Sequence, residues 1–525
     1  MSETPGELGV LPRPEKLRRH NGSFRLSEPT RIQWAGGESQ SVAELLAGYL
    51  RPATGFPLPV EEETQRHEPA IVLRQTGDDP PDDAGFFDET YRLSVSEQGV
   101  ELSSPSAAGL ARGIQTLRQL FPSAIYAPDT QREPWVVPCV DIEDRPACRW
   151  RGMHLDVVRH FFDVDTVCRF IELLAIHRFN VCHLHLTDDQ GWRLEIEKYP
   201  KLTEIGSKRK QTLVGHERTR PRQYDGVEAG GFFTRAQARE IVAFAARRHV
   251  TVVPEIEMPG HSQAAIASYP ELGNTGCPIE PRCHWGVSQH VLNVEDATVG
   301  FMKDVLDETI DLFPSRFIHV GGDEVPRTQW SESPRAQQRM RELGLTSEDQ
   351  LQSWFIQQVD RHLAERGRRL IGWDEILEGG LAPGATVMSW RGEEGGITTA
   401  RQGHDVVMAP SSHIYFDHYQ SFPREEEPLA IGGMSSTDFV YSYQPLPAGL
   451  EPELHRHVLG AQGQLWSEYI PDRDHLDYMA FPRASALAEA LWLEPDAKDY
   501  ADFLRRLAVH RQRFTQLRVN AHPRP

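Results

Sequence analysis

Two adjacent carboxylates, Asp323 and Glu324, follow two glycines in the segment HVGGDE, residues 319–324. An apolar run precedes them, so the pair is expected where a strand ends. Neighbouring side chains of a regular strand point to opposite faces, so both acids reach one pocket only if the strand ends or distorts there, which glycines permit. Two close acids can hold different protonation states, as acid catalysis on a stable bond requires. A plain polar turn is the alternative, because glycine and aspartate are ordinary turn residues.

The elements that must position these acids follow a repeating pattern from about residue 145 onward. Eight strands are predicted, near residues 151–156, 181–186, 250–253, 317–320, 369–373, 386–390, 405–408 and 459–463. Helical patterns lie between them, and Thr234 and Ser347 are predicted to begin two of the helices. Eight strands are the number that a closed parallel barrel needs, so the alternation predicts a (β/α)8 TIM barrel of the α/β class.

Three regions are predicted. Residues 1–145 form a smaller α+β domain, with a hairpin of residues 91–95 and 100–102 and an amphipathic helix from Ala107 to Leu120. Residues 146–495 form the catalytic barrel. Residues 496–525 form a terminal helix that packs on the barrel, because its apolar residues recur at helical spacing.

Composition limits the function classes. The 525 residues are 39% hydrophobic and 25% charged, as in globular proteins, and the net charge of -20 disfavours nucleic acid and anionic membranes as partners. No apolar run is long enough to span a bilayer. Residues 1–6 lack the features of a leader, which predicts a cytoplasmic location, although a leader that was removed stays an alternative. Six cysteines fit a reducing compartment, and whether Cys277 and Cys283 pair across their short loop is open.

Reactive side chains follow every predicted strand. In a TIM barrel such residues meet at the carboxyl ends of the strands. The strand ends in order are Arg159-His160, residues 188–193, residues 255–261, Asp323-Glu324, residues 373–375, Trp390-Arg391, residues 415–417 and residues 466–468. A pocket with several tryptophans and carboxylates suits a sugar, because pyranose faces stack on aromatic rings and hydroxyl groups need paired donors and acceptors.

With these motifs the chain resembles the β-N-acetylhexosaminidases of glycoside hydrolase family 20. The resemblance rests on HVGGDE at 319–324, LDVVRHFF at 155–162, HLHLTDDQGW at 183–192, MPGH at 258–261 and WSE at 466–468. It covers nearly the whole chain, because residues 1–145 look like the non-catalytic domain of that family. One departure is Met153-His154, where the family more often has two apolar residues.

The resemblance implies an exo-acting, retaining hydrolase of terminal non-reducing N-acetylglucosamine or N-acetylgalactosamine. The acetamido oxygen of the substrate would attack the anomeric carbon and form an oxazolinium intermediate, a departure from the usual two-carboxylate scheme. Glu324 would be the general acid and later the base, Asp323 would hold the acetamido N–H, and Tyr415 would donate to its oxygen. The other implied site residues are Asp188 and His261 behind Glu324, the pocket walls Trp373, Trp390 and Trp466, and the hydroxyl contacts Arg159, Asp417 and Glu468.

No cofactor and no metal is implied, and the expected partner is a glycan, a chito-oligosaccharide or a glycoconjugate. The preference between the two sugars stays open, and so does a homodimer. Three other functions are alternatives. A diguanylate cyclase would need phenylalanine where this chain has Val325, and a metal-dependent amidohydrolase would use His183 and His185 as ligands. A glycan-binding protein without catalysis is disfavoured by the complete set of acids.

Overall fold

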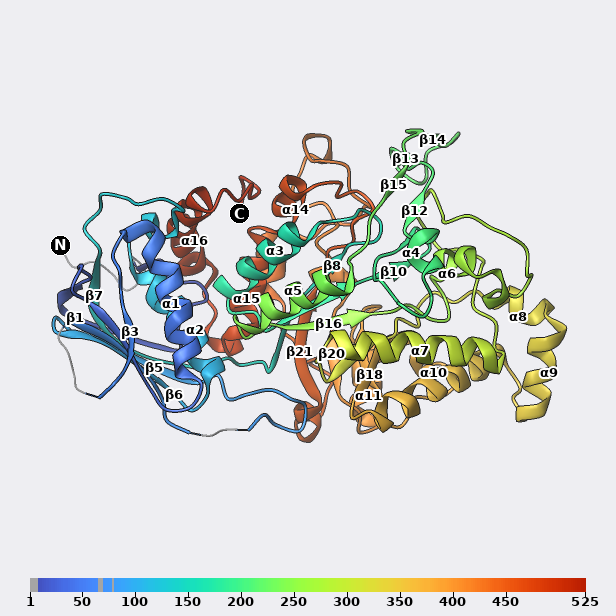
Figure 1. Ribbon diagram of the computed structural model, residues 1–525, viewed down its shortest axis with the longest axis horizontal. Helices are drawn as coiled ribbons and strands as arrows, with labels where there is room; N and C mark the ends of the chain where they lie inside the picture. Colours follow the sequence, from blue (N-terminus) through green and yellow to red (C-terminus); the bar gives the residue numbers. More distant parts are fainter. Residues whose placement is uncertain (1–7, 65–68, 78–79) are drawn as a thin grey trace.

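The computed structural model describes residues 8–64, 69–77 and 80–525 of the chain. Residues 1–6, from which the absence of a leader was predicted, lie outside the described residues. Figure 1 shows two bodies side by side, a twisted sheet drawn in blue and a larger barrel drawn from cyan to red. The order of the bodies follows the chain, with the sheet first.

The first body is a seven-stranded sheet in the order β1-β7-β5-β6-β4-β2-β3. The strands are β1 (Lys16–Arg25), β2 (Arg31–Ala35), β3 (Val60–Glu62), β4 (Ala70–Gln75), β5 (Tyr91–Val95), β6 (Gly99–Ser104) and β7 (Val136–Asp144). Helices α1 (Ser39–Thr54) and α2 (Ala107–Leu120) pack on this sheet and on each other. The predicted hairpin is confirmed as the antiparallel pair β5–β6, and α2 has the predicted bounds. Strand β7, which lies between β1 and β5, was not predicted.

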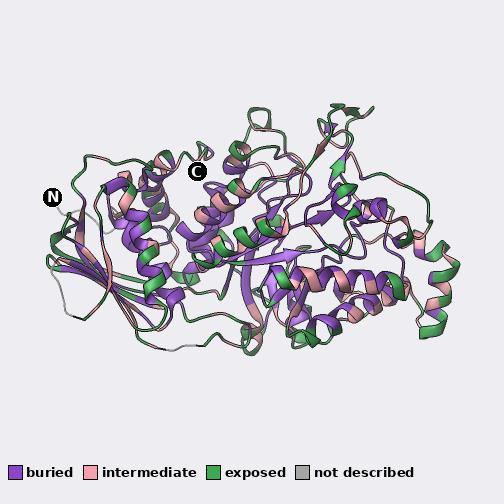
Figure 2. Ribbon diagram, in the orientation of Figure 1, coloured by how far each residue is buried: buried purple, intermediate pink, exposed green. Residues whose placement is uncertain are grey.

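The second body is a closed barrel of eight parallel strands, which confirms the predicted fold class. Its strands are β8 (Trp150–Asp156), β9 (Val181–His185), β16 (Thr251–Glu255), β17 (Phe317–His319), β18 (Arg369–Trp373), β19 (Thr386–Ser389), β20 (Val406–Met408) and β21 (Val458–Gly463). Every strand coincides with a predicted one. Figure 2 shows the barrel strands in purple, as expected for parallel strands that are covered by helices on the outside.

Helices surround the barrel, and their caps follow the sequence signals. The longer ones are α3 (Val164–Ile176), α5 (Arg235–Ala246), α7 (Asp296–Leu312), α10 (Glu348–Glu365), α11 (Glu394–Arg401), α14 (Arg473–Ala480) and α15 (Arg483–Trp492). Thr234 forms a reciprocal capping box with Gln237 at the start of α5, and Ser347 caps α10 by accepting from the backbone N–H of Gln350. Both predicted helix starts are therefore confirmed.

Helix α16 (Tyr500–Gln516) contacts both bodies. Arg506 forms an ion pair with Glu489 of α15 at 2.6 Å and also donates to the backbone oxygen of Val10 at 3.0 Å. His510 lies 3.2 Å from His177, at the end of α3. The helix therefore joins the sheet domain to the barrel.

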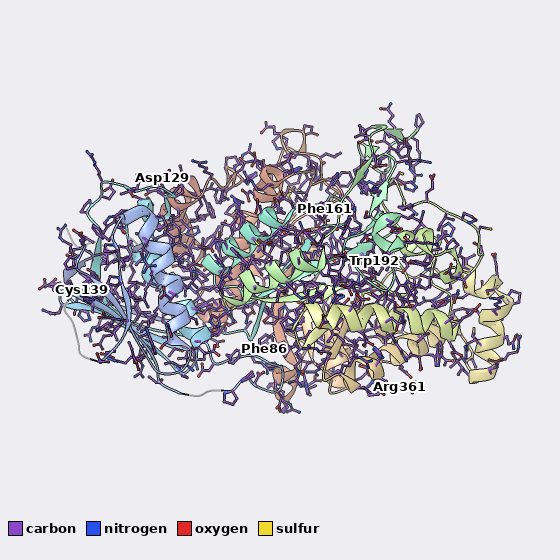
Figure 3. The ribbon with its side chains drawn as sticks, viewed as in Figure 1. Phe86, Asp129, Cys139, Phe161, Trp192 and Arg361 are labelled. Carbon is purple, nitrogen blue, oxygen red and sulfur yellow. The ribbon has the colours of Figure 1, made fainter. Side chains whose placement is uncertain are left out.

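A side chain of the sheet domain packs against the amino end of the barrel. Phe86 packs edge-on against Trp150 of β8, with ring centroids 6.1 Å apart, and lies 6.4 Å from the ring of Phe317. Figure 3 labels Phe86 on the side of the barrel nearer the sheet domain and Trp192 farther from that domain. The opposite end of the barrel is left for a site.

The structure bears on two questions that the composition raised, a loop disulfide and a membrane span. Cys277 and Cys283 are both free thiols, so the loop disulfide that the sequence left open is not formed. Within the described ranges no helix has the length and apolarity needed to cross a membrane.

A buried ion pair ties the sheet domain to the barrel. Asp144 at the end of β7 accepts from Arg178 at 2.7 Å, and neither side chain is exposed. The other carboxylate oxygen accepts from the indole N–H of Trp492 at 2.9 Å. Because Arg178 and Trp492 belong to the barrel, a single carboxylate of the sheet domain holds both.

Asp144→Asn should lower the free energy of unfolding by about 3 kcal/mol, because it leaves the buried guanidinium of Arg178 without its counter-charge. Urea titration would measure the change. Asp141→Asn on the same strand is the control, because Asp141 is exposed and its loss should cost about 0.5 kcal/mol or less. Equal losses for the two variants would contradict the role given to Asp144.

Candidate active site

One cavity of ≈ 300 Å³ lies at the carboxyl ends of the barrel strands. Its lining comes from seven of the strand ends and the loops beyond them: Arg159, His261, Asp323, Glu324, Trp373, Trp390, Ser411, Tyr415, Asp417, His418, Ile431, Trp466 and Glu468. The structure thus brings together all of the predicted site residues except Asp188, which lies behind His261. Their chemical roles stay predictions.

A larger cavity of ≈ 590 Å³ lies at the other end of the barrel. It is lined by residues where strands begin, among them Cys148, Arg369 and Val458. Because barrel enzymes carry their chemistry at the carboxyl ends of the strands, the smaller cavity is the candidate active site.

The adjacent acids share this cavity because the backbone leaves the strand before it reaches them. Strand β17 ends at His319, and Gly321, Gly322 and Glu324 have φ values of +65°, +95° and +47°. These left-handed values turn two successive side chains toward one side, which a strand cannot do. A Cβ atom at Gly321 would lie 1.6 Å from Oε2 of the buried Glu257, so only glycine fits there.

A histidine links the acids to a buried aspartate. His261 Nδ1 lies 3.1 Å from Asp188 Oδ1, and His261 Nε2 lies 3.4 Å from Glu324 Oε2 and 3.6 Å from Asp323 Oδ2. Burial alone would lower the pKa of His261, but the carboxylates of Asp188 and Asp323 outweigh it and raise the pKa well above its ordinary value. His261 is therefore a buried imidazolium that faces both acids.

The two acids differ in proton affinity. Burial raises the pKa of Asp323 to about 6, helped by the neighbouring Glu324 and opposed by His261. The pKa of Glu324 is lowered, chiefly by its interaction with His261, and its side chain is 42% exposed. In the free protein a single proton on the pair therefore resides on Asp323. Glu324 can hold that proton only when the surroundings of the pair change.

Four aromatic side chains form a wall of the cavity. The indole rings of Trp373 and Trp466 have centroids 5.8 Å apart at 43°, and Trp390 stacks on Tyr415 at 6.2 Å. Trp390 Nε1 donates to Glu375 Oε2 at 3.0 Å, which fixes its ring. The wall presents apolar faces together with the Tyr415 hydroxyl, and such a surface suits a sugar ring with a polar substituent.

Charged groups face this wall. Arg159 donates to Asp156 at 3.1 Å, lies 2.6 Å from Asp188, and stacks over the ring of Trp466 at 4.9 Å. Burial raises the pKa of Asp417 well above its ordinary value, and the nearby Glu468 adds to the increase. These donors and acceptors can bind hydroxyl groups in fixed orientations.

Two acids near the cavity were not predicted to act there. Glu375 lies two positions after Trp373, and burial next to Asp323 raises its pKa to about 8. Glu257 lies behind Gly321 with neither carboxylate oxygen hydrogen-bonded to any described residue. Both lie in predicted strand ends, residues 255–261 and 373–375, but no individual role was predicted for either.

Two further residues of the DDQGW motif are buried, and Asp189 Oδ2 lies 3.5 Å from His261 Nδ1. Asp189 is buried and accepts from the backbone N–H of Gln263 at 3.0 Å. Trp192 is buried and donates to the backbone oxygen of Leu194 at 2.7 Å. Both hold the loop that follows β9.

The histidines of the metal hypothesis lie inside the barrel. His183 and His185 are fully buried beside Glu255 and do not line the cavity. His183 Nδ1 accepts from Gln462 at 2.8 Å, so a neutral His183 carries its hydrogen on the nitrogen that faces Glu255. This nitrogen has no lone pair to offer an ion, which disfavours the amidohydrolase alternative.

Comparisons with known proteins agree with this geometry. Residues 148–495 match the catalytic domain of glycosyl hydrolase family 20, and residues 7–145 match domain 2 of that family. A β-hexosaminidase of Porphyromonas gingivalis is 43% identical over 517 residues, which are 98% of this chain but 64% of that protein. This chain therefore spans less than two thirds of that relative.

Solved structures are similar over the full length. A GH20 β-N-acetylhexosaminidase from Streptomyces coelicolor A3(2) superposes with a TM-score of 0.84 at 33% identity, covering 100% of this chain and 99% of that one. A mutant β-hexosaminidase of Streptomyces plicatus in complex with product (GlcNAc) gives the same TM-score and identity over 99% of this chain and 97% of that chain.

Gly321→Ala should reduce kcat/KM on a nitrophenyl N-acetylglucosaminide by about 100-fold or more, because the clash with Glu257 displaces the acids that follow. The control is Gly367→Ala, which has a similar φ of +68° with nothing within 4 Å of the added Cβ. The control should lose stability alone. If both variants kept wild-type kinetics, the turn would not be what places the acids.

Proposed function

Because the chain belongs to glycosyl hydrolase family 20, we propose that it is an exo-acting, retaining β-N-acetylhexosaminidase that removes terminal non-reducing N-acetylglucosamine or N-acetylgalactosamine. The observation that carries the proposal is the cavity itself, where Asp323, Glu324 and Tyr415 face the tryptophans. Its ≈ 300 Å³ suit one sugar. The complex of the Streptomyces plicatus relative with GlcNAc supports the choice of sugar.

The proposed reaction uses the acetamido group of the substrate as nucleophile. Tyr415 lies beside the tryptophan wall, where its hydroxyl can donate to the acetamido oxygen and aim it at the anomeric carbon. Asp323 accepts from the acetamido N–H and offsets the positive charge that develops as the oxazolinium ring closes. The anomeric bond to the leaving oxygen breaks as Glu324 protonates that oxygen. Glu324 then takes a proton from water, which opens the ring with net retention.

Substrate binding corrects the resting proton distribution. In the free protein the proton of the pair lies on Asp323, whereas the reaction needs it on Glu324. An acetamido N–H that donates to Asp323 stabilises its ionised form, and a sugar that covers the 42% exposed side chain of Glu324 disfavours ionisation there. Binding of the correct sugar therefore moves the proton to the group that uses it.

Glu324→Gln should reduce hydrolysis of chitobiose by about 1000-fold, because the amide cannot protonate the leaving oxygen. Hydrolysis of a dinitrophenyl N-acetylglucosaminide, whose leaving group needs no proton, should fall much less. Steady-state rates on the two substrates would be compared. Glu342→Gln, on the exposed face of α9 (Pro334–Leu343), is the control. Equal losses on both substrates would rule out Glu324 as the general acid.

The pH dependence follows from the one proton that the pair must carry. Above pH about 6 this proton leaves Asp323, so kcat/KM should fall about tenfold per pH unit. The acid limb lies lower, where Glu324 with its lowered pKa takes up a second proton. In Asp323→Asn only Glu324 of the pair titrates. The alkaline limb of the residual activity should therefore move from about pH 6 to a lower pH. An unchanged limb near 6 in this variant would contradict the assignment.

A further inference from the structure

His185 lies between two buried carboxylates in the interior of the barrel. Its Nδ1 contacts Oε2 of Glu255, and its Nε2 donates to Asp188 Oδ2 at 2.9 Å. None of His185, Glu255 and Asp188 is more than 2% exposed. An ionised carboxylate only accepts hydrogen bonds, so both ring nitrogens must carry hydrogen. This geometry makes His185 an imidazolium.

The indole N–H of Trp150 can only donate a hydrogen bond, and this determines the hydrogen positions around Glu255. The indole N–H of Trp150 donates to Oε1 of Gln462 at 3.3 Å, which turns the amide nitrogen of Gln462 toward His183 Nδ1 at 2.8 Å. His183 therefore carries its hydrogen on Nε2, 3.2 Å from Glu255 Oε2. The carboxylate of Glu255 thus faces N–H groups of both His183 and His185.

The side chains that connect Glu255 to Glu324 alternate in charge. The order is Glu255, His185, Asp188, His261 and Glu324, and the last two contacts measure 3.1 Å and 3.4 Å. Arg159, 2.6 Å from Asp188, is the main group that keeps Asp188 ionised, and the hydrogen bond from His185 adds to this effect. The ionised Asp188 in turn keeps His261 charged.

We propose that His185 and Glu255 are positioning residues, which hold the Asp188–His261 pair in its charged arrangement and thereby control the proton on the acid pair. The inference rests on the proposed role of Glu324 as general acid. His185 touches no substrate group, because it does not line the cavity. It acts through Asp188 and His261.

Other charged and aromatic groups surround His185. Asp156 of β8 interacts favourably with its charge, and Arg159 opposes it by sharing Asp188. His154 of β8 lies 5.7 Å away between ring centroids, with neither nitrogen hydrogen-bonded to any described residue. The ring of Trp466 lies 5.0 Å away, edge to face. Among the described residues, the side chains that hydrogen-bond to the imidazole are Glu255 and Asp188.

His185→Gln removes the positive charge beside Asp188. The more negative potential raises the proton affinity of the acid pair, so both limbs of the kcat/KM profile should move upward by about 0.5 pH unit. kcat on chitobiose should fall about 10- to 100-fold with little change in KM, because the acid is misplaced while the sugar contacts remain. The dinitrophenyl glycoside should lose much less. Limbs at their wild-type positions with an unchanged kcat would overturn the proposal.

Glu255→Gln tests the same series of charged groups by removing a negative charge instead of a positive one. It replaces His185→Gln as the test if that variant does not fold. Removal of this negative charge lowers the proton affinity of the pair if His185 keeps its proton, and leaves it unchanged if His185 loses it. The alkaline limb should therefore stay at or below its wild-type position while kcat falls. An upward shift or a full kcat would contradict the inference.

His154→Met is the matched control, because it removes a buried imidazole from the same barrel interior that has no hydrogen bond to the chain of charges. Its pH limbs should remain in place, and thermal unfolding would report the packing change separately. A shift equal to that of His185→Gln would mean that any change in this interior disturbs the acids. The Glu324→Gln result separates the two proposals: if that variant is crippled and the His185 variant is normal, only the positioning role fails.

Discussion

The left-handed turn after β17 is the constraint on which the site depends. Two successive carboxylates occupy one cavity because Gly321, Gly322 and Glu324 all leave the extended region of the backbone. A strained conformation at Glu324, which has a side chain, needs support from its surroundings. Glu257 packed under Gly321 and the amide of Gln352, which donates to the backbone oxygen of Gly322 at 2.6 Å, supply this support.

Once the acids are close, their surroundings divide the work between them. Burial favours a proton on Asp323, and the imidazolium of His261 favours a charge on Glu324. That distribution is the reverse of the one the proposed reaction uses. In the proposed mechanism the acid would form only when an acetamido group binds to Asp323. A sugar without this group would leave Glu324 ionised, so the proposal couples substrate recognition to the position of the proton.

The sequence predicted the barrel and the ring of site residues because both follow local rules. Buried parallel strands are short apolar runs, and the carboxyl ends of eight such runs must meet. The sheet domain was harder to predict. Strand β1 is a mostly exposed edge strand, and β7 alternates Asp141 and Glu143 with apolar residues next to Pro138, so neither has a strong pattern.

The positions of the protons could not be predicted from the sequence, for a different reason. That Asp188 and His261 stand behind Glu324 was implied by the family resemblance, but the charge on His185 depends on a carboxylate 70 positions away in the chain. The side of Gln462 that faces His183 depends on an indole 312 positions away. Distances of this kind exist only in the folded barrel.

The hydroxyl-binding side of the cavity follows the same physical logic as the acid pair. Burial raises the pKa of both carboxyl groups, and the increase is larger for Asp417, where Glu468 adds to it, than for Glu468, where Arg159 opposes it. Of the two, Asp417 therefore takes up a proton first, and one of its oxygens has no hydrogen-bond partner among the described residues. A protonated carboxyl group both donates and accepts, whereas an ionised one only accepts. The two acids thus present different hydrogen-bonding patterns to a sugar, and a hydroxyl group between them is held in one orientation.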